Sequence, residues 1–364
     1  MHQAAAPVRR GEVMRHDRES VGLQGFTPVY HPAGFDRELR AVLADLQMGR
    51  WLSVRDLLAQ TGDDWALRTA RTQVLAVAAA RTDGVEAWLA EEPDSADAAV
   101  MRARVAVERA LQAHRAGQAT LVALESQARQ ACLIAARRVP ADPVPWVGLL
   151  ALAQVDVGLQ YGEHWRVAWE EMLPAGPWGL LARVCERDSS SAREAFHRMM
   201  QFFYACPHTS VADAINFSQW TVSWAPVGSP LRMLPLYAYM ESYRRHREEG
   251  TADPLQHRQW SREPVIHYVK RAFLGWNIRA APCTSVVDLN YLAHALWAGH
   301  QYADAAKVFQ VLDRNATRLP WAYVCDDPSS PQSAMREFVR ARAQCLTTTR
   351  TRAVASSKHS LRSV

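Results

Sequence analysis

The sequence predicts an all-α fold, and two observations support this prediction. Apolar residues recur at positions i, i+3, i+4 and i+7 through segments of roughly 10 to 20 residues, the pattern of a helix with one buried face. Each segment ends at a cluster of Gly, Pro or Asp. Only Thr221–Trp224 alternates like a strand, and Pro226 follows it closely, which disfavours a strand there.

We expect helices to follow one another along most of the chain, from Phe35 to Thr347. The clearest segments are Phe35–Gly49, Trp65–Arg81, Ser95–Gly117, Val144–Val157, Ser190–Tyr204, Leu231–Arg247 and Ser285–Gly299. Ser191 and Glu194 have the spacing of a capping box. Asp63–Asp64 and Asp326–Asp327 have the residue type that begins helices or occupies loops.

Composition and charge indicate an ordinary globular chain. The 364 residues are 49% apolar and 22% charged, and the formal net charge is +5. Four bases and no acid lie in the last eighteen residues, 347–364. Removing those four from the 42 basic residues leaves 38 bases against 37 acids. The near-neutral body disfavours a basic groove, so we expect no specific nucleic-acid partner.

The chain divides by composition into three parts. We expect residues 1–32 to form a poorly ordered N-terminal extension, 33–346 to form the helical domain, and 347–364 to form a basic flexible tail. The N-terminus lacks the apolar core of a signal peptide, and no stretch predicts a membrane span. Six scattered cysteines without a CxxC pair suit reduced thiols. We therefore expect a cytoplasmic protein, and 39 arginines against three lysines suggest a bacterial, GC-rich genome.

The segment Val286–Pro320 has the pattern of a helical hairpin. Gly299 marks its turn, and the small residues Ala293 and Ala305 fall where two helices would pack closest. The apolar positions are Leu289, Leu292, Ala293 and Leu296 on the first helix, and Tyr302, Ala305, Phe309 and Leu312 on the second. A second copy, one residue shorter at the turn, consists of Leu39, Leu46, Gly49, Trp51, Val54 and Leu58.

These hairpins resemble tetratricopeptide repeats. The resemblance implies an antiparallel helix-hairpin array, a tetratricopeptide-like α-solenoid that is partly degenerate. Pro93 and Pro140 each precede a further long helix, but their spacing of 47 residues exceeds a standard repeat. The chain is also similar to uncharacterised bacterial tetratricopeptide-like proteins, a likeness that implies no chemistry. An irregular helical bundle remains the alternative, and whether residues 175–282 continue the array is open.

One candidate partner site lies on the first helix of the C-terminal hairpin. Asn290, His294 and Trp297 are spaced i, i+4 and i+7, so we expect them to share a face turned away from the packing residues. In a tetratricopeptide array that face would line a concave groove for a peptide. The alternative without a binding role is that Trp297 covers the core and His294 is solvated.

An alternative site is a tryptophan-lined pocket. Trp165 and Trp169 would share a helix face, as would Trp220 and Trp224, and Glu163 and His164 flank the first pair. Core packing is the commoner role of such residues. With polar neighbours, however, these rings could hold a small ligand.

No motif predicts catalysis, a metal or a cofactor. The Asp pairs lack the third carboxylate that would gather magnesium around a diphosphate, which excludes a terpene synthase. Cys206 and His208 have no second ligand pair. We find no phosphate-binding Gly-rich loop, nucleophile elbow or HExxH motif. The sequence therefore predicts a non-enzymatic protein- or peptide-binding scaffold, with a small-ligand receptor or enzyme as the alternative.

Overall fold

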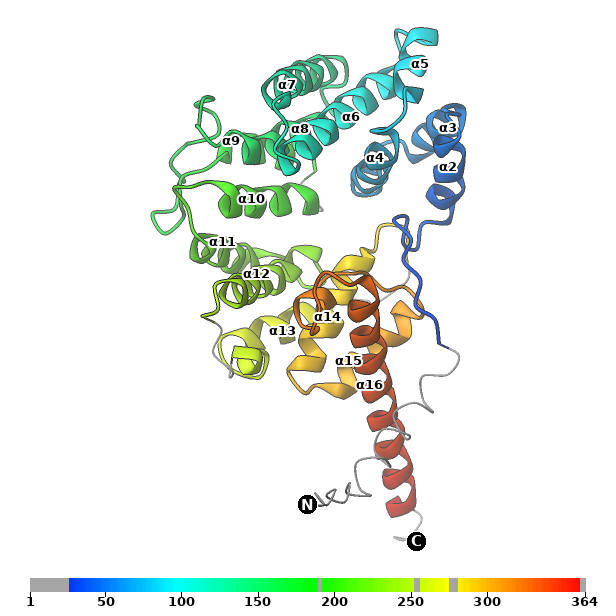
Figure 1. The fold of residues 1–364 in the computed structure, drawn as a ribbon, viewed down its shortest axis with the longest axis vertical. Helices are drawn as coiled ribbons and strands as arrows, with labels where there is room; N and C mark the ends of the chain where they lie inside the picture. Colours follow the sequence, from blue (N-terminus) through cyan, green and yellow to red (C-terminus); the bar gives the residue numbers. More distant parts are fainter. Residues whose placement is uncertain (1–25, 189–191, 252–255, 275–280, 361–364) are drawn as a thin grey trace, which may run out of the picture.

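The chain folds into helices and the loops that join them (Figure 1). The computed structural model describes residues 26–188, 192–251, 256–274 and 281–360. The α-helices are α2 (Arg37–Gln47), α3 (Leu52–Thr61), α4 (Trp65–Ala79), α5 (Gly84–Glu91), α6 (Ala96–Arg115), α7 (Leu121–Arg138), α8 (Val144–Leu152), α9 (Trp178–Cys185), α10 (Arg193–Ala205), α11 (Val211–Trp224), α12 (Leu234–Glu248), α13 (Val265–Phe273), α14 (Val286–Ala298), α15 (Tyr302–Leu312) and α16 (Pro331–Ser360). Four short 3₁₀ helices are η1 (Ala153–Val155), η2 (Pro230–Met233), η3 (Gln256–Ser261) and η4 (Trp321–Tyr323).

The all-α prediction is confirmed for the described residues, which contain no strand beyond two isolated bridges. Each of the seven clearest predicted segments is a helix with ends displaced by a few residues. Residues Thr221–Trp224, where the sequence disfavoured a strand, complete helix α11. Ser191 of the expected capping box lies outside the described residues.

Local capping explains where several helices begin. Asp64 is the N-cap of α4 and accepts a hydrogen bond from the Leu67 amide at 3.1 Å, as expected for this Asp pair. Ser285 caps α14 in the same way through the Asp288 amide. Both satisfy amides that a helix N-terminus leaves without an intrahelical acceptor.

Two glycines set turns between paired helices. Gly49, between α2 and α3, has φ of 77°, a conformation that glycine adopts without steric cost. Gly299 follows α14, and a Cβ there would lie 2.7 Å from the carbonyl oxygen of Trp260. The second turn therefore requires glycine because another backbone segment approaches it closely.

Alternate helices pack against one another along the chain. Contacts run from α2 to α4, α4 to α6, α6 to α8, α8 to α10, α10 to α12, α12 to α14 and α14 to α16. The odd-numbered helices pack beside them, as in α2 with α3, α6 with α7, α8 with α9, α10 with α11, α12 with α13 and α14 with α15. The segment 175–282 takes part in the same pattern through α9 to α13.

The buried apolar residues form three clusters along the chain. One lies in residues 33–105, a second in 100–238 and a third in 233–345. Ile215 and Tyr237 pack against both the second and the third cluster. No helix among the described residues is both long and apolar enough to cross a membrane.

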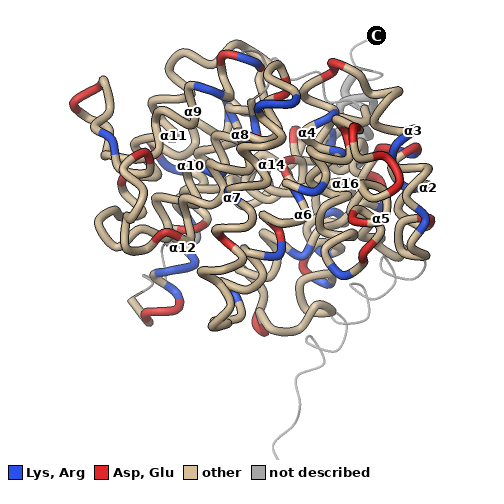
Figure 2. Tube along the Cα trace, turned by 90° about the horizontal axis from the view of Figure 1, so that it is seen from above, with Lys and Arg blue, Asp and Glu red and all other residues tan. Residues whose placement is uncertain are grey.

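Arginine–carboxylate pairs join segments that are distant in sequence. Four that are largely buried are Arg71–Asp36, Arg68–Asp142, Arg104–Glu194 and Arg193–Asp288. Figure 2 shows basic and acidic residues interspersed along the trace. Each of the four pairs connects two segments of the chain, so these charged side chains contribute to contacts inside the fold.

The two ends of the helical region also meet. The Val29 amide donates to the Arg314 carbonyl at 2.7 Å, and the Ala316 amide donates to the Val29 carbonyl at 3.0 Å. The Phe26 ring stacks on Phe338 of α16. Residues 26–32, expected to belong to a poorly ordered extension, thus pack on the C-terminal helices.

At the other boundary, α16 continues through Ser360. It therefore crosses the boundary that we expected between a helical domain ending at 346 and a tail beginning at 347. Residues 361–364 lie outside the described residues.

Candidate functional site

The predicted groove residues Asn290 and His294 are buried in α14. Asn290 donates to the Val286 carbonyl at 2.8 Å, and its Oδ1 accepts from Trp321 Nε1 at 2.9 Å and from the Thr317 amide at 3.4 Å. These bonds fix the chain that follows α15 against α14. The expectation that Asn290 faces an open groove is therefore wrong.

His294 is enclosed by three indole rings. The ring centroids of Trp260, Trp297 and Trp321 lie 5.4, 5.8 and 5.4 Å from its own. Burial lowers the pKa of His294 to about 3, so the imidazole is neutral at pH 7. His294 is 1% exposed, and it too cannot contact a partner in this conformation.

Trp297 lies at the edge of this aromatic group and is partly buried. Its Nε1 donates to Gln344 Oε1 of α16 at 2.8 Å. Helices α12, α13, α15 and α16 all contact α14, so α14 is covered on more than one face. Among the described residues, the elements packed on α14 therefore leave Asn290 and His294 no access to a partner.

The residues of the alternative pocket lie in two separate regions: the tryptophans in an exposed loop region, and Glu163 and His164 in a buried polar cluster. Residues 156–177, between η1 and α9, contain bends and turns in place of a helix, so Trp165 and Trp169 do not share a helix face. Trp165 packs on Phe202 and His208. Glu163 and His164 instead turn towards Asp156 and α7.

Glu163 and His164 belong to a buried polar cluster with Asp156 and Arg129. His164 Nδ1 lies 2.8 Å from Asp156 Oδ2, and Arg129 donates to Glu163 Oε1 at 2.6 Å. Burial would raise the pKa of Asp156, but hydrogen bonds from the Gln160 and Tyr161 amides and from His164 outweigh it and lower that pKa.

The ionised Asp156 determines the tautomer of His164. Burial lowers the pKa of His164, although Asp156 opposes this shift. A neutral imidazole beside a carboxylate carries its proton on Nδ1. Nε2 is then a bare acceptor, and the described residues provide no hydrogen-bond partner for it.

Two further atoms of this cluster are buried without a partner among the described residues. They are Glu125 Oε1 and Arg129 Nη1, both on α7. Burial raises the pKa of Glu125, and the Asp156 charge adds to this effect. Buried polar atoms without partners are rare in folded proteins. In this cluster, Glu125, Arg129 and His164 are therefore the residues that carry hydrogen-bonding atoms without a described partner.

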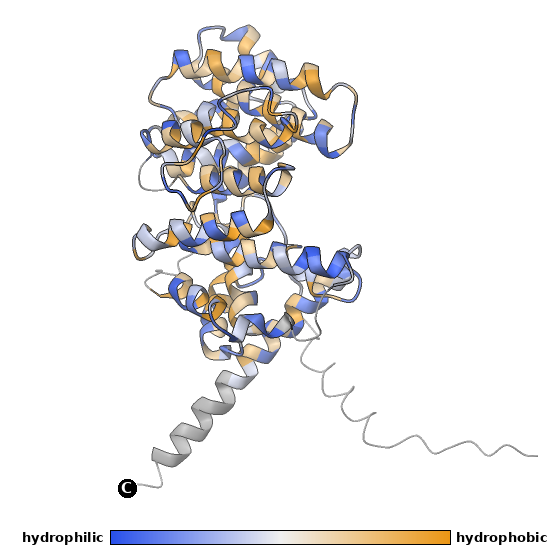
Figure 3. Cartoon of the chain, turned by 90° about the vertical axis from the view of Figure 1, so that its left-hand side faces the viewer, coloured by the Kyte–Doolittle hydropathy of each residue, from blue (hydrophilic) through white to orange (hydrophobic). Residues whose placement is uncertain are grey.

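Trp169 lies in an exposed apolar loop, which the helical spacing of Trp165 and Trp169 did not predict. The backbone groups of Arg166 and Gly176 exchange two hydrogen bonds, of 3.0 and 2.9 Å, and close a loop over residues 167–175. Its outward side chains Val167, Trp169 and Met172 are 90%, 63% and 82% exposed. Figure 1 shows this loop beside α9, α10 and α11, and Figure 3 views the molecule from that side.

Inward residues anchor this loop. Ala168 and Leu173 are buried in the core, and Trp178 Nε1 donates to the Pro174 carbonyl at 2.9 Å. A Cβ on Gly176 would lie 3.2 Å from a ring carbon of Phe203. The backbone is thus fixed while its apolar tip faces solvent.

The aromatic surface extends from the loop onto helix α11. The Trp169 ring lies 5.7 Å from Trp220, which lies 5.4 Å from Trp224. Trp224 is itself 46% exposed. We call Val167, Trp169, Met172, Trp220 and Trp224 the tryptophan-loop surface. The sequence carries one signal for it, since Pro174, Gly176 and Pro177 interrupt the helix that would pair Trp165 with Trp169.

No three or more His, Cys, Asp or Glu side chains come together in metal-binding geometry within the part of the chain that the structure describes. In comparisons with known proteins, no family model, no curated protein and no solved structure matches this chain.

Proposed function

We propose that this chain is a non-enzymatic, protein-binding scaffold that acts in a bacterial cytosol through its tryptophan-loop surface. The observation that carries the proposal is the hydrogen-bonded loop that holds Val167, Trp169 and Met172 in solvent. Exposing apolar surface of this kind to water is unfavourable in free energy, and burying it against a partner removes this cost. Trp and Met are also enriched in the buried centres of protein interfaces.

The proposed scaffold is a tetratricopeptide-like array with degenerate repeats. The alternate packing of even-numbered helices, with odd-numbered helices beside them, supports this arrangement. The hydrogen bonds between Val29 and residues 314–316 add a contact between the two ends of the array. In this proposal the array positions a rigid loop on its side, and the partner docks there.

Site-specific photocrosslinking tests the proposal. Benzoylphenylalanine replaces Val167 or Met172, and crosslinking is carried out in lysate of cells that naturally produce the chain. We expect one heterologous protein to be crosslinked from both positions. Trp169→Ala in the same chains should reduce the yield at least tenfold, since large interface aromatics carry much of a binding free energy.

A matched control uses Val122 of α7, which is 73% exposed and lies on another helix. Crosslinker at Val122 should not capture the same protein. Circular dichroism and thermal melting confirm that each variant is folded. Equal capture from Val122, or capture indifferent to Trp169→Ala, contradicts this function. Crosslinks only to a second copy of the chain contradict it as well.

We propose as a second candidate that the polar cluster binds a small molecule with a primary carboxamide group. The carboxamide oxygen would accept from Arg129 Nη1, and its NH₂ group would donate to Glu125 Oε1 and His164 Nε2. These are three of the twelve buried side-chain atoms that have no hydrogen-bond partner among the described residues. A cation would be repelled by Arg129, and an anion by Glu125 in its ionised form.

Acetamide and urea titrations followed by ¹H–¹⁵N spectra of the His164 ring test this second candidate. We expect saturable shifts of the Nε2 resonance in wild type, with a smaller response in Glu125→Ala. Acetate, which lacks the NH₂ donors, serves as the matched probe. Equal shifts with acetate, or no shifts at all, contradict the carboxamide site.

A further inference from the structure

The segment that precedes α2 runs beside the C-terminal helices (Figure 1). We call residues 26–30 the strap. Val29 uses both of its backbone groups there: its amide donates to the Arg314 carbonyl at 2.7 Å, and its carbonyl accepts from the Ala316 amide at 3.0 Å. Arg314 Nε also donates to the Thr27 carbonyl at 3.0 Å. The strap thus pairs with 314–316 through a parallel bridge, as an extended peptide pairs with an exposed strand edge.

One side chain of the strap packs on α16. The ring centroids of Phe26 and Phe338 are 6.5 Å apart with 20° between the ring planes, and the guanidinium carbon of Arg342 lies 4.0 Å from the Phe26 centroid. Phe338 is fully buried, and the rings of Phe309 and Trp321 pack behind it. Ring stacking and a cation–π contact therefore hold Phe26 on a rigid aromatic surface.

The edge that receives the strap is fixed by bonds in which the strap takes no part. The Asn315 amide donates to the Leu312 carbonyl at 2.8 Å, and the Thr317 amide donates to Asn290 Oδ1 at 3.4 Å. These contacts belong to the C-terminal hairpin and the chain that follows it. We therefore expect the edge to keep its shape when the strap leaves, and a preorganised site loses less conformational entropy on binding.

The strap buries less surface than the turn between it and α2. Val29 and Tyr30 are 41% and 62% exposed, whereas Ala33 and Asp36 are 6% and 2% exposed. Asp36 also forms the buried ion pair with Arg71. Local opening costs least where few apolar groups are buried, so the strap can leave α16 while the turn before α2 stays anchored.

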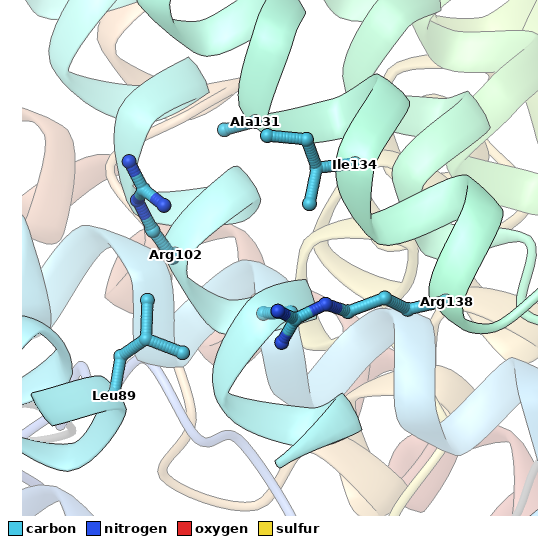
Figure 4. Close-up of a pocket in the computed structure, with 6 residues that line it drawn as sticks. Leu89, Arg102, Ala131, Ile134 and Arg138 are labelled. Carbon is cyan, nitrogen blue, oxygen red and sulfur yellow. The ribbon is translucent and has the colours of Figure 1, made fainter. Parts of the chain in front are cut away.

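The contacts show what kind of segment this edge accepts. In the small hollow between α5, α6 and α7 (Figure 4), no described part of the chain indicates an occupant. At 314–316, three backbone hydrogen bonds hold an occupant without regard to its side chains, and Phe26 adds the aromatic contact. Pro28 favours an extended backbone in the residue before it. A matching segment is therefore extended, with an aromatic residue, a proline two positions later and then a free amide.

We propose that the edge at 314–316 and the adjoining face of α16 form a binding site for an extended partner segment of this pattern, and that the strap occupies the site in cis. The strap is then a competitor, held by the same chain at high effective concentration. The partner segment binds when the strap leaves. This site shares no residue with the tryptophan-loop surface, so it goes beyond the proposed function.

A peptide with the sequence of the strap, fluorescein-Gly-Phe-Thr-Pro-Val-Tyr-His-amide, tests the proposal on the full chain. Fluorescence anisotropy compares its binding to wild type and to Phe26→Ala/Val29→Pro, in which the strap loses its ring contact and its amide donor. We expect at least about tenfold tighter binding to this double variant, because the strap no longer competes. Val29→Pro alone should show a smaller gain. Tyr30→Ala, at an exposed strap position, is the matched control and should bind as wild type does.

Peptide variants test the recognised pattern in the double variant. Exchanging the peptide's Phe for Ala, or its Val for Pro, should weaken binding at least about fivefold. A second peptide with the same pattern and other residues, fluorescein-Ser-Tyr-Ser-Pro-Ile-Gln-Asn-amide, should still bind. Adding Arg342→Gln should weaken the binding of both peptides about two- to fivefold.

Hydrogen exchange locates the bound peptide. The Ala316 amide should exchange faster in the double variant than in wild type, and the strap peptide should slow it again. The Thr317 amide, which donates to Asn290, should keep its wild-type rate throughout.

Equal peptide affinity for wild type and the double variant overturns occupation in cis, and no binding to the folded double variant overturns the site. If circular dichroism shows that the double variant is unfolded, Val29→Pro decides in its place. Binding of the strap peptide without the second peptide overturns the proposed partner pattern. A wild-type dimer in light scattering that the strap peptide dissociates makes a second copy the occupant and also overturns the proposal. None of these results depends on Trp169, so they are separable from the crosslinking test of the scaffold.

Discussion

Arg104 of α6 and Glu194 of α10 form a buried ion pair between residues that are 90 positions apart. Arg104 Nη1 donates to Glu194 Oε1 at 3.0 Å, and Arg198 Nη2 donates to the same oxygen at 2.9 Å. Burial would raise the pKa of Glu194, but the two guanidinium groups outweigh it and lower that pKa to about 2. The pair links two elements that sequence spacing cannot relate.

Removing the Glu194 charge should strongly destabilise the fold. We expect Glu194→Gln to lower the free energy of unfolding by about 3–5 kcal/mol, because two buried guanidinium groups lose their carboxylate. Urea titration at pH 7 measures the change. Asp45→Asn breaks the exposed pair with Arg50 and should have little effect. Similar unfolding midpoints for both variants would contradict a stabilising role for this pair.

Buried His294 should make stability depend on pH. Its pKa of about 3 in the folded chain lies below the ordinary value of 6.5. Between these values the unfolded chain holds a proton that the folded chain does not. The resulting stability is complete above pH 6.5 and is lost as the pH falls towards 3.

His294→Leu should remove this dependence. The slope of unfolding free energy against pH between pH 6 and 4 should fall by about 1.4 kcal/mol per unit, the value for one proton. Urea titrations at a series of pH values measure it. His267→Leu, at an exposed position, should change the slope less. An unaltered slope in His294→Leu would refute the assignment of a neutral buried imidazole.

Asn290 should contribute to stability as a buried hydrogen-bonding residue. In Asn290→Ala, the Trp321 indole and the Thr317 amide lose their acceptor. Each unsatisfied buried donor costs about 1–3 kcal/mol, so we expect a loss of at least about 2 kcal/mol in unfolding free energy. Gln344→Ala, which removes the exposed partner of Trp297, is the control. Equal effects of the two variants would argue against this role.

Gly148 of α8 should resist substitution because α7 approaches it closely. A Cβ there would lie 2.8 Å from Cys132 Sγ and 3.3 Å from Val107 Cγ2. Overpacking costs about 1–3 kcal/mol, while alanine regains only about 1 kcal/mol of helix propensity over glycine. Thermal melting of Gly148→Ala should therefore show a net loss of stability.

Removing the close sulfur should relieve part of this overpacking. Gly148→Ala combined with Cys132→Ala should be less destabilised than the sum of the two single variants. Gly162→Ala, where a Cβ would meet nothing within 4 Å, should lose no stability. Strict additivity of the two core substitutions would contradict the proposed steric contact.

The sequence by itself determined the helical class and the approximate ends of α2, α4, α6, α8, α10, α12 and α14. These are the helices that stack consecutively. Helical periodicity, the Asp64 and Ser285 caps and the turn at Gly49 depend on residues close in sequence, so local physics specifies them. The hairpin within Val286–Pro320 was predictable for the same reason.

Only the tertiary structure decided which helix faces remain open. Asn290 and His294 have the spacing of an exposed stripe, yet η3, η4 and the surrounding helices cover them. Trp165 and Trp169 have helical spacing, yet the Arg166–Gly176 bridge bends the chain into a loop. Burial and loop closure depend on residues brought together from far along the chain, so periodicity fixes the faces of a helix but not what covers them.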